Sequence, residues 1–192
     1  LRIRSVGVRL LGIVDIARPR EGRAKLGEIN RAINLAIRST SDEAQYGETD
    51  VWAAPLASFA RGAGDCEDYA IAKFAALRLA GIAAEDLRIL IMRDTLRGED
   101  HAVAAARLDG RWLTLDNRRM AMIEDTDIRN YRPTFVMDSE AVRRYAPMTL
   151  FSATVSAALV TGAASGSAVA ADAKIVKGDV KKGEAAAQMC QP

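Results

Sequence analysis

The residues best suited to chemistry are a cysteine, a histidine and an aspartate that lie far apart in the chain. Cys66 stands in the stretch GDCEDYA (residues 64–70), His101 is the only histidine, and Asp116 follows a short apolar run. A thiolate can attack a carbonyl carbon, an imidazole can move the thiol proton to the leaving amine, and a carboxylate can orient the imidazole. These residue types predict nucleophilic chemistry at Cys66 if the fold brings them together.

The segment after Asp65 has the pattern of a helix that begins at the cysteine. Asp65 is a suitable N-cap residue, Asp68 follows at capping-box spacing, and apolar residues then recur with helical period up to Gly81. Cys66 is then the first helical residue, where unpaired N–H groups and the helix dipole favour a thiolate. The carboxylates of Asp65, Glu67 and Asp68 oppose that effect unless they lie outside the thiol's immediate field or a cation neutralises them.

His101 and Asp116 fall on two strands of a predicted hairpin. The runs 101–108 and 111–117 flank an Asp-Gly pair, which is the strongest two-residue hairpin turn signal in the chain. Counting back from this turn, Val103 opposes Asp116, so His101 is a diagonal neighbour of Asp116 on the same face. Such neighbours are close enough for a hydrogen bond between imidazole and carboxylate. A β-bulge would instead place the next residue, an asparagine, on that face.

The other patterns complete a mixed α+β chain. Residues 24–38 repeat apolar side chains with helical period, and residues 87–92 are an aliphatic run typical of a strand. Residues 133–136 predict a last short strand and residues 139–145 a short helix. Residues 1–19 show no clear period, and we leave them unassigned.

Length, charge and cysteine content narrow the class of protein. A chain of 192 residues with a formal net charge of +2 is long enough for one domain with a core and gives no electrostatic reason to bind nucleic acid. Its aromatic residues are too few and scattered for a base-stacking platform. Two cysteines exclude a disulfide framework and a cysteine-based zinc site.

The end of the chain has a different composition. Residues 149–171 are small, apolar and uncharged, follow a pair of arginines and contain Ala-Val-Ala, which is the pattern of a secretory signal peptide. Residues 178–192 weakly resemble the opening of a small c-type cytochrome, whereas no haem is expected for residues 1–147. A flexible tail and a weak membrane anchor are the alternatives. We therefore expect one domain over residues 20–147 and a separate reading unit or disordered tail over residues 148–192.

Taken together, these motifs resemble the signature blocks of the bacterial transglutaminase-like cysteine peptidases. The resemblance covers about residues 20–147 and implies an α+β fold of the papain/transglutaminase type, with the cysteine at the N-terminus of a helix packed on an antiparallel sheet. It implies that Cys66 is the nucleophile, His101 the general base and Asp116 the orienting acid. The residues that carry it are GDCEDYA at 64–70, His101-Ala102-Val103, Leu115-Asp116-Asn117, Asn30, Asn34, Asp50, Trp52, Pro55 and Tyr131-Arg132-Pro133.

The resemblance also implies a cofactor and a biological setting. Well-known members are periplasmic, calcium-dependent endopeptidases that release large surface adhesins and biofilms under control of a cyclic-di-GMP-sensing membrane protein. Calcium is held there by acids beside the cysteine, which correspond to Asp65, Glu67 and Asp68 in this chain. Hard carboxylate oxygens suit calcium. The alternative is that these acids only cap and solvate the first turn of the helix.

Three functions follow from the sequence. The first is a cysteine endopeptidase that acts on a protein substrate. The second is a transamidase that uses the same thioester intermediate but passes the acyl group to an amine. The third is a non-catalytic calcium-binding module, against which the presence of Cys66, His101 and Asp116 argues.

Overall fold

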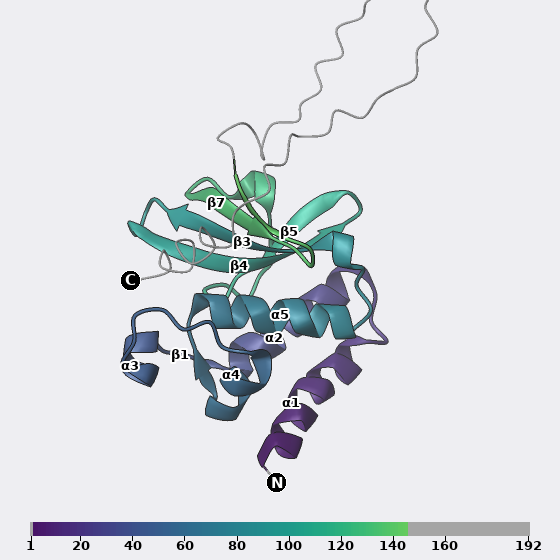
Figure 1. Cartoon of the computed structure of the whole chain (residues 1–192). Helices are drawn as coiled ribbons and strands as arrows, with labels where there is room; N and C mark the ends of the chain where they lie inside the picture. Colours follow the sequence, from purple (N-terminus) through teal and green to yellow (C-terminus); the bar gives the residue numbers. More distant parts are fainter. Residues whose placement is uncertain (1, 146–192) are drawn as a thin grey trace, which may run out of the picture.

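The centre of the fold is an antiparallel sheet with the strand order β6-β5-β4-β3-β7-β8. The computed structural model describes residues 2–145, with side chains from residue 7 onward. Figure 1 shows the strands stacked as one layer above the helices. Their bounds are β3 Leu87–Asp94, β4 Glu99–Leu108, β5 Arg111–Leu115, β6 Ile123–Glu124, β7 Tyr131–Met137 and β8 Val142–Arg144.

The β4–β5 hairpin has the predicted register. Asp109 and Gly110 form the turn, with φ of 51° and 77°, so both residues adopt the left-handed backbone that a tight primed turn requires. The paired residues run back from Leu108 and Arg111 at the turn to Ala104 and Leu115. The ladder ends one residue before Asp116, which leaves the backbone of Asp116 to be held by other groups.

The helices cover one face of the sheet. Helix α5, Cys66–Leu79, lies against β4, and Figure 1 shows α2, α4 and α1 on the far side of α5. A two-stranded parallel ladder of β1 and β2 leads into α5. The remaining bounds are α1 Arg2–Ala17, α2 Gly22–Ala36, β1 Arg38–Ser39, α3 Asp42–Tyr46, α4 Pro55–Arg61, β2 Ala63–Gly64, η1 Ala84–Asp86 and η2 Asp125–Asp127.

Alternation along β3 and β4 divides the core between the two faces of the sheet. Ile89, Ile91 and Ala102 pack under α5 beside Cys66. Leu90 and Val103, one position along each strand, pack on the opposite face. A third cluster joins α5 to α1, α2 and α4, and it contains the fully buried Phe59, Ile33 and Leu77. Burial of these apolar side chains is the main force that fixes α5, and therefore Cys66, on the sheet.

The N-terminal segment, for which the sequence shows no clear period, contains helix α1. Leu10, Val14 and Ala17 face the core at helical spacing, whereas Val8, Leu11 and Ile16 are exposed. These exposed apolar side chains mask the amphipathic period in the sequence. None of the helices in the described residues combines the length and apolar character that a membrane span needs.

The helix predicted over residues 139–145 is wrong. The backbone N–H groups of Glu140 and Ala141 donate to Asp138, which turns the chain back, and Val142–Arg144 then pairs with β7 as strand β8. A seven-residue segment has too few internal hydrogen bonds to offset helix nucleation, so pairing with an existing strand is favoured. The predicted signal-like and cytochrome-like tail, residues 148–192, lies outside the described residues.

Candidate active site

Cys66 occupies the predicted place at the start of α5. The helix begins at Cys66, with Asp65 at the N-cap position, and the thiol is almost buried at 8% exposure. The preceding residue pair, Ala63–Gly64, is tied to β1. A Cβ atom on Gly64 would lie only 2.6 Å from Oδ2 of Asp68, so a glycine lets the first turn of α5 come close to the chain that enters it. The backbone just before Cys66 is thus held by β1 on one side and by the first turn of α5 on the other.

His101 and Asp116 are in direct contact. Nε2 of His101 lies 2.9 Å from Oδ1 of Asp116, and both side chains are buried. Burial alone would raise the pKa of Asp116, but the hydrogen bond and charge of His101, together with further donors, hold it well below its ordinary value. Asp116 is therefore an ionised carboxylate that accepts from Nε2–H, which leaves Nδ1 as the basic nitrogen of the ring.

Cys66 and His101 interact. Burial would lower the pKa of His101, but the hydrogen bond to Asp116 and the interaction with Cys66 outweigh it, so the pKa is raised. Apart from the interaction of the ring with Cys66, Nδ1 has no hydrogen-bond partner in the described part of the chain. It is the nitrogen available to receive a proton from the thiol. The three residues that the sequence singles out are thus brought together around one imidazole.

Two residues to which the sequence assigns no role complete the surroundings of Asp116. The hydroxyl of Tyr131 donates to Oδ2 at 2.7 Å, and its ring centroid is 5.5 Å from that of His101. The backbone N–H of Arg118 donates to Oδ1 at 2.9 Å. Each carboxylate oxygen of Asp116 is therefore paired. Tyr131 belongs to one of the motifs that carry the family resemblance, but no pattern within one sequence shows that β7 brings it to Asp116.

A polar pocket of about 190 Å³ opens beside the thiol. Arg118 lines it and is held there by ion pairs to Glu99 and to the buried Asp94. Its lining residues are Ser39, Ser41, Asp65, Cys66, Glu99, Asp100, Asn117 and Arg118.

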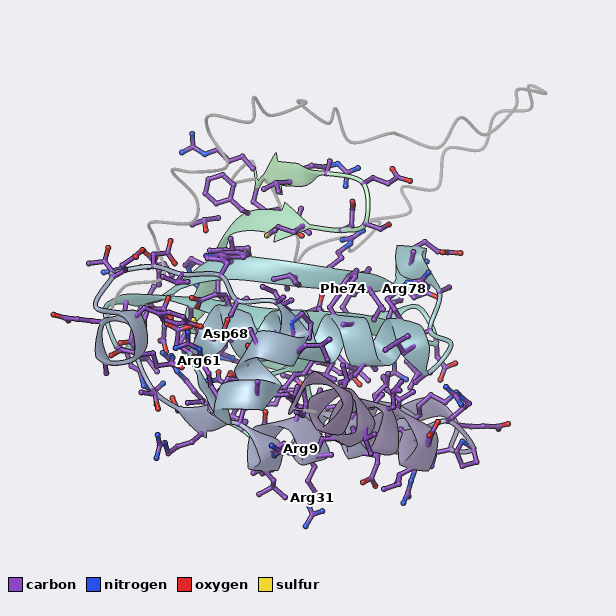
Figure 2. The ribbon with its side chains drawn as sticks, turned by 60° about the horizontal axis from the view of Figure 1, so that its bottom comes forward. Arg9, Arg31, Arg61, Asp68, Phe74 and Arg78 are labelled. Atoms are coloured by element: carbon purple, nitrogen blue, oxygen red, sulfur yellow. The ribbon has the colours of Figure 1, made fainter. Side chains whose placement is uncertain are left out.

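The acids beside Cys66 form a larger cluster than the sequence indicates. Asp42 and Asp50 join Asp65, Glu67 and Asp68, and potential ligand oxygens of two such triplets lie within 4.8 Å of one another. Asp42 comes from α3 and Asp50 from the segment before α4, so no spacing in the sequence reveals them. Figure 2 places Asp68 near the N-terminal end of α5, with Arg78 near the other end.

These acids do not form the predicted capping box. The side chain of Asp65 makes no capping hydrogen bond, and Glu67 and Asp68 are fully buried, so the first turn is not solvated by them. The carboxylates instead face one another. Burial, with smaller contributions from neighbouring charges, raises the pKa of Asp50 to about 6 and that of Asp68 to about 7. It also raises the pKa of Asp65 and, still more, that of Glu67.

The cluster fits a hard divalent cation. Four buried carboxylate oxygens have no hydrogen-bond partner in the described residues, namely Asp42 Oδ1, Asp65 Oδ1, Glu67 Oε1 and Asp68 Oδ2. Buried acceptors left unpaired are costly, and a cation that takes oxygen ligands would pair with the oxygens of either triplet. The same cluster also affects the nucleophile, because the Cys66 thiol donates to Oε2 of Glu67 at 3.2 Å. A negative charge on Glu67 at this position opposes a thiolate on Cys66, and the raised pKa of Glu67, which is due first to burial, also reflects the same repulsion.

A thiol at a helix N-terminus, beside a buried imidazole and a carboxylate on an antiparallel sheet, is the arrangement of the papain/transglutaminase-like fold. The family model of the bacterial transglutaminase-like cysteine proteinases (BTLCP) matches residues 12–141, and the chain belongs to this family. The match extends into α1, beyond the residues that carry the resemblance in the sequence. A comparison with curated proteins finds no significant match.

Solved structures of LapG from Legionella pneumophila have the same fold. One is 22% identical and superposes with a TM-score of 0.64 over 73% of this chain and 78% of LapG. A calcium-bound LapG structure is 21% identical, with a TM-score of 0.65 over 74% and 79% of the two chains. An EGTA-treated one is also 21% identical, with a TM-score of 0.64 over 73% and 76%. At this identity the likeness shows the fold.

Proposed function

We propose that this cysteine peptidase cleaves internal peptide bonds of a protein substrate through a triad of Cys66, His101 and Asp116. The observation that carries the proposal is the 2.9 Å hydrogen bond between Nε2 of His101 and Asp116. This bond leaves Nδ1 as the ring nitrogen that can accept the proton of the Cys66 thiol. The helix N-terminus at Cys66 adds a favourable field for the thiolate.

In the proposed reaction the Cys66 thiol gives its proton to Nδ1 of His101, and the sulfur bonds to the carbonyl carbon of the substrate. His101 then passes the proton to the leaving amine as the C–N bond breaks, and a thioester remains. Water attacks the thioester while His101 takes one of its protons, which releases the acid product and restores the thiol. Asp116 holds the Nε2–H group throughout and stabilises the imidazolium.

We further propose that calcium binds the acid cluster of Asp42, Asp50, Asp65, Glu67 and Asp68. The unpaired buried oxygens support it, as do the calcium-bound and EGTA-treated states in which LapG has been solved. Bound calcium would supply positive charge that cancels the carboxylates around Cys66 and so removes their opposition to the thiolate. Of the three acids expected from the sequence, each belongs to this cluster, and Asp42 and Asp50 extend it.

For the biological role, we propose a periplasmic enzyme that releases a large surface adhesin and so controls biofilm, with a cyclic-di-GMP-sensing membrane protein as its regulator. Support comes from membership of the family and from the resemblance described above. Addition of the purified protein to adhesin-bearing cells should release a large polypeptide into the medium. Release that is equally strong with the Cys66→Ala variant would contradict this role.

The nucleophile is tested by Cys66→Ala. We expect peptidase activity to fall by at least about 10³-fold, because no other group in the site replaces the thiolate. Iodoacetamide at neutral pH should modify the peptide that contains residues 64–70 in the parent protein, as seen by mass spectrometry, and this label should be lost in the variant. Cleavage that persists in Cys66→Ala would refute the assignment. Product carrying an added primary amine in place of a free acid would identify a transamidase.

A further inference from the structure

A lysine without a role in the reaction above is buried beneath the nucleophile. Lys73 lies on α5 seven residues after Cys66, which is two turns of the same helix, and therefore on the same face. Its side chain is fully buried, at 0% exposure. Lysine is almost never buried completely unless its ammonium group has partners. The burial of Lys73 therefore depends on the groups that its ammonium group contacts.

The ammonium group of Lys73 reaches the strand that leads to Asp116. Nζ donates to the backbone carbonyl of Leu115 at 3.1 Å, and it lies 5.7 Å from the ring centroid of Tyr69 on its own helix. Burial lowers the pKa of Lys73 to about 7, and Asp116 is the charged group that opposes this shift. Lys73 thus joins the helix of the nucleophile to the residue directly before the orienting acid.

This contact replaces sheet pairing at the place where it stops. The β4–β5 ladder ends at Leu115, and the next carbonyl, that of Asp116, accepts a hydrogen bond from Nδ2 of Asn34 on α2 at 2.9 Å. Two consecutive carbonyls are therefore held by side chains from two different helices. The backbone that sets the direction of the Asp116 side chain is fixed by Lys73 and Asn34.

We propose that Lys73 is a positioning residue, which ties helix α5 to the end of β5 and so keeps Asp116 and His101 aligned with the Cys66 thiol. This inference rests on the proposed triad. The hydrogen bond of the ammonium group is to the backbone of Leu115, and we infer that Lys73 acts through that backbone. A lysine can make this connection because its four-carbon stem crosses the packed interface between α5 and β5, and its ammonium group donates to the carbonyl of Leu115.

The test is Lys73→Met, which keeps a long apolar side chain and removes the donor. With saturating calcium we expect kcat to fall about 10- to 100-fold with KM unchanged, because misalignment affects the reaction and not the binding of substrate. Lys25→Met is the matched control, since Nζ of Lys25 also donates to a backbone carbonyl, that of Ala80 at the C-terminal end of α5, far from the thiol. That control should leave kcat unchanged.

A double-mutant cycle separates positioning from simple stability. The alkylation rate of Cys66 is measured in the parent, Lys73→Met, Asp116→Asn and the double variant. If Lys73 acts through Asp116, its substitution costs nothing further once Asp116 has been replaced. Independent losses that multiply in the double variant would overturn the proposal, as would a Lys73→Met protein with the parent's kcat.

A failure to fold is distinguished from a failure of positioning by a second variant. If Lys73→Met does not unfold cooperatively on heating, the same comparison is made with Lys73→Gln, whose shorter amide keeps a donor without the charge. Failure of both variants to fold would assign Lys73 to stability and overturn the positioning role. Absence of activity and of Cys66 labelling in the parent protein would instead refute the triad itself, so the two failures are distinguishable.

Discussion

Two groups of buried carboxylates flank the Cys66–His101 pair, and their environments differ. Asp116 has its oxygens paired with His101, Tyr131 and a backbone N–H, and its pKa is lowered. The acid cluster around Asp68 has unpaired buried oxygens and raised pKa values. The protein alone completes the first environment, whereas the raised pKa values of the second show that its charge is relieved by protons or, as proposed, by a bound cation. The Asp116 side of the thiol is therefore preorganised, whereas the charge of the acid-cluster side depends on what binds there.

Asp116→Asn should have the largest effect. Asparagine cannot stabilise an imidazolium and favours the wrong tautomer of His101, so we expect kcat to fall by about 10³- to 10⁴-fold. Calcium should not restore it, because the defect lies on the preorganised side. Steady-state kinetics with and without calcium measure both points, and recovery of activity at high calcium would contradict the division into two sides.

Asp68→Asn should have a smaller and conditional effect. Loss of one carboxylate should weaken calcium binding by about 10- to 100-fold, and activity should return as the calcium concentration is raised. EGTA should inactivate the parent protein, with recovery on adding calcium but not magnesium. The control is Asp15→Asn, since Asp15 is an exposed acid on α1. Activity that is indifferent to EGTA would remove calcium from the proposed mechanism.

The smallest expected effect concerns the pH dependence of stability. The folded protein holds protons on Asp50 and Asp68 up to about pH 6 and 7, whereas the unfolded chain releases them near the ordinary aspartate pKa of 3.8. Stability without calcium should therefore fall as pH rises through this window, by several degrees in Tm. His101, with its raised pKa, adds to the loss above its unfolded pKa of about 6.5.

The contribution of Asp116 to stability depends on pH in the opposite direction. Its pKa is lowered, so its stabilisation is present above the ordinary aspartate pKa of 3.8 and is lost as pH falls below it. Thermal melts from about pH 2 to 8 with EGTA, repeated with calcium and with Asp68→Asn, separate the contributions, since that of Asp116 is lost only below about pH 4. Calcium and Asp68→Asn should each flatten the decline between pH 5 and 7. A decline that is unchanged by both would contradict the assignment to the acid cluster.

The sequence predicts one side of the site much better than the other. The contact of His101 with Asp116 follows from the turn signal and the alternation of a single hairpin, which are local properties of the chain. The helix start at Cys66 is local as well. Because a two-residue turn permits only one register, the residue types around Asp109 and Gly110 are enough to place His101 beside Asp116.

The remaining contacts depend on packing between distant elements. Asp42 and Tyr131 reach the site from α3 and β7, and no period or spacing links them to Cys66. Lys73 lies two helical turns after Cys66, but the sequence does not show that its ammonium group reaches Leu115. The predicted capping box is wrong for the same reason, because the local rule assumes that the first turn is exposed to solvent. Helix α1 escapes prediction because its exposed apolar side chains hide its buried stripe.

The segment that carries Trp52 is attached to the acid cluster. The backbone N–H groups of Val51 and Ala53 donate to Asp42 and Asp68, and the indole N–H of Trp52 donates to Asp50 at 3.1 Å. Trp52 packs beside Cys66, and the only other tryptophan, Trp112, packs against the opposite face of the sheet. In a Trp112→Phe background, indole fluorescence would therefore report directly on the charge state of the cluster beside the thiol.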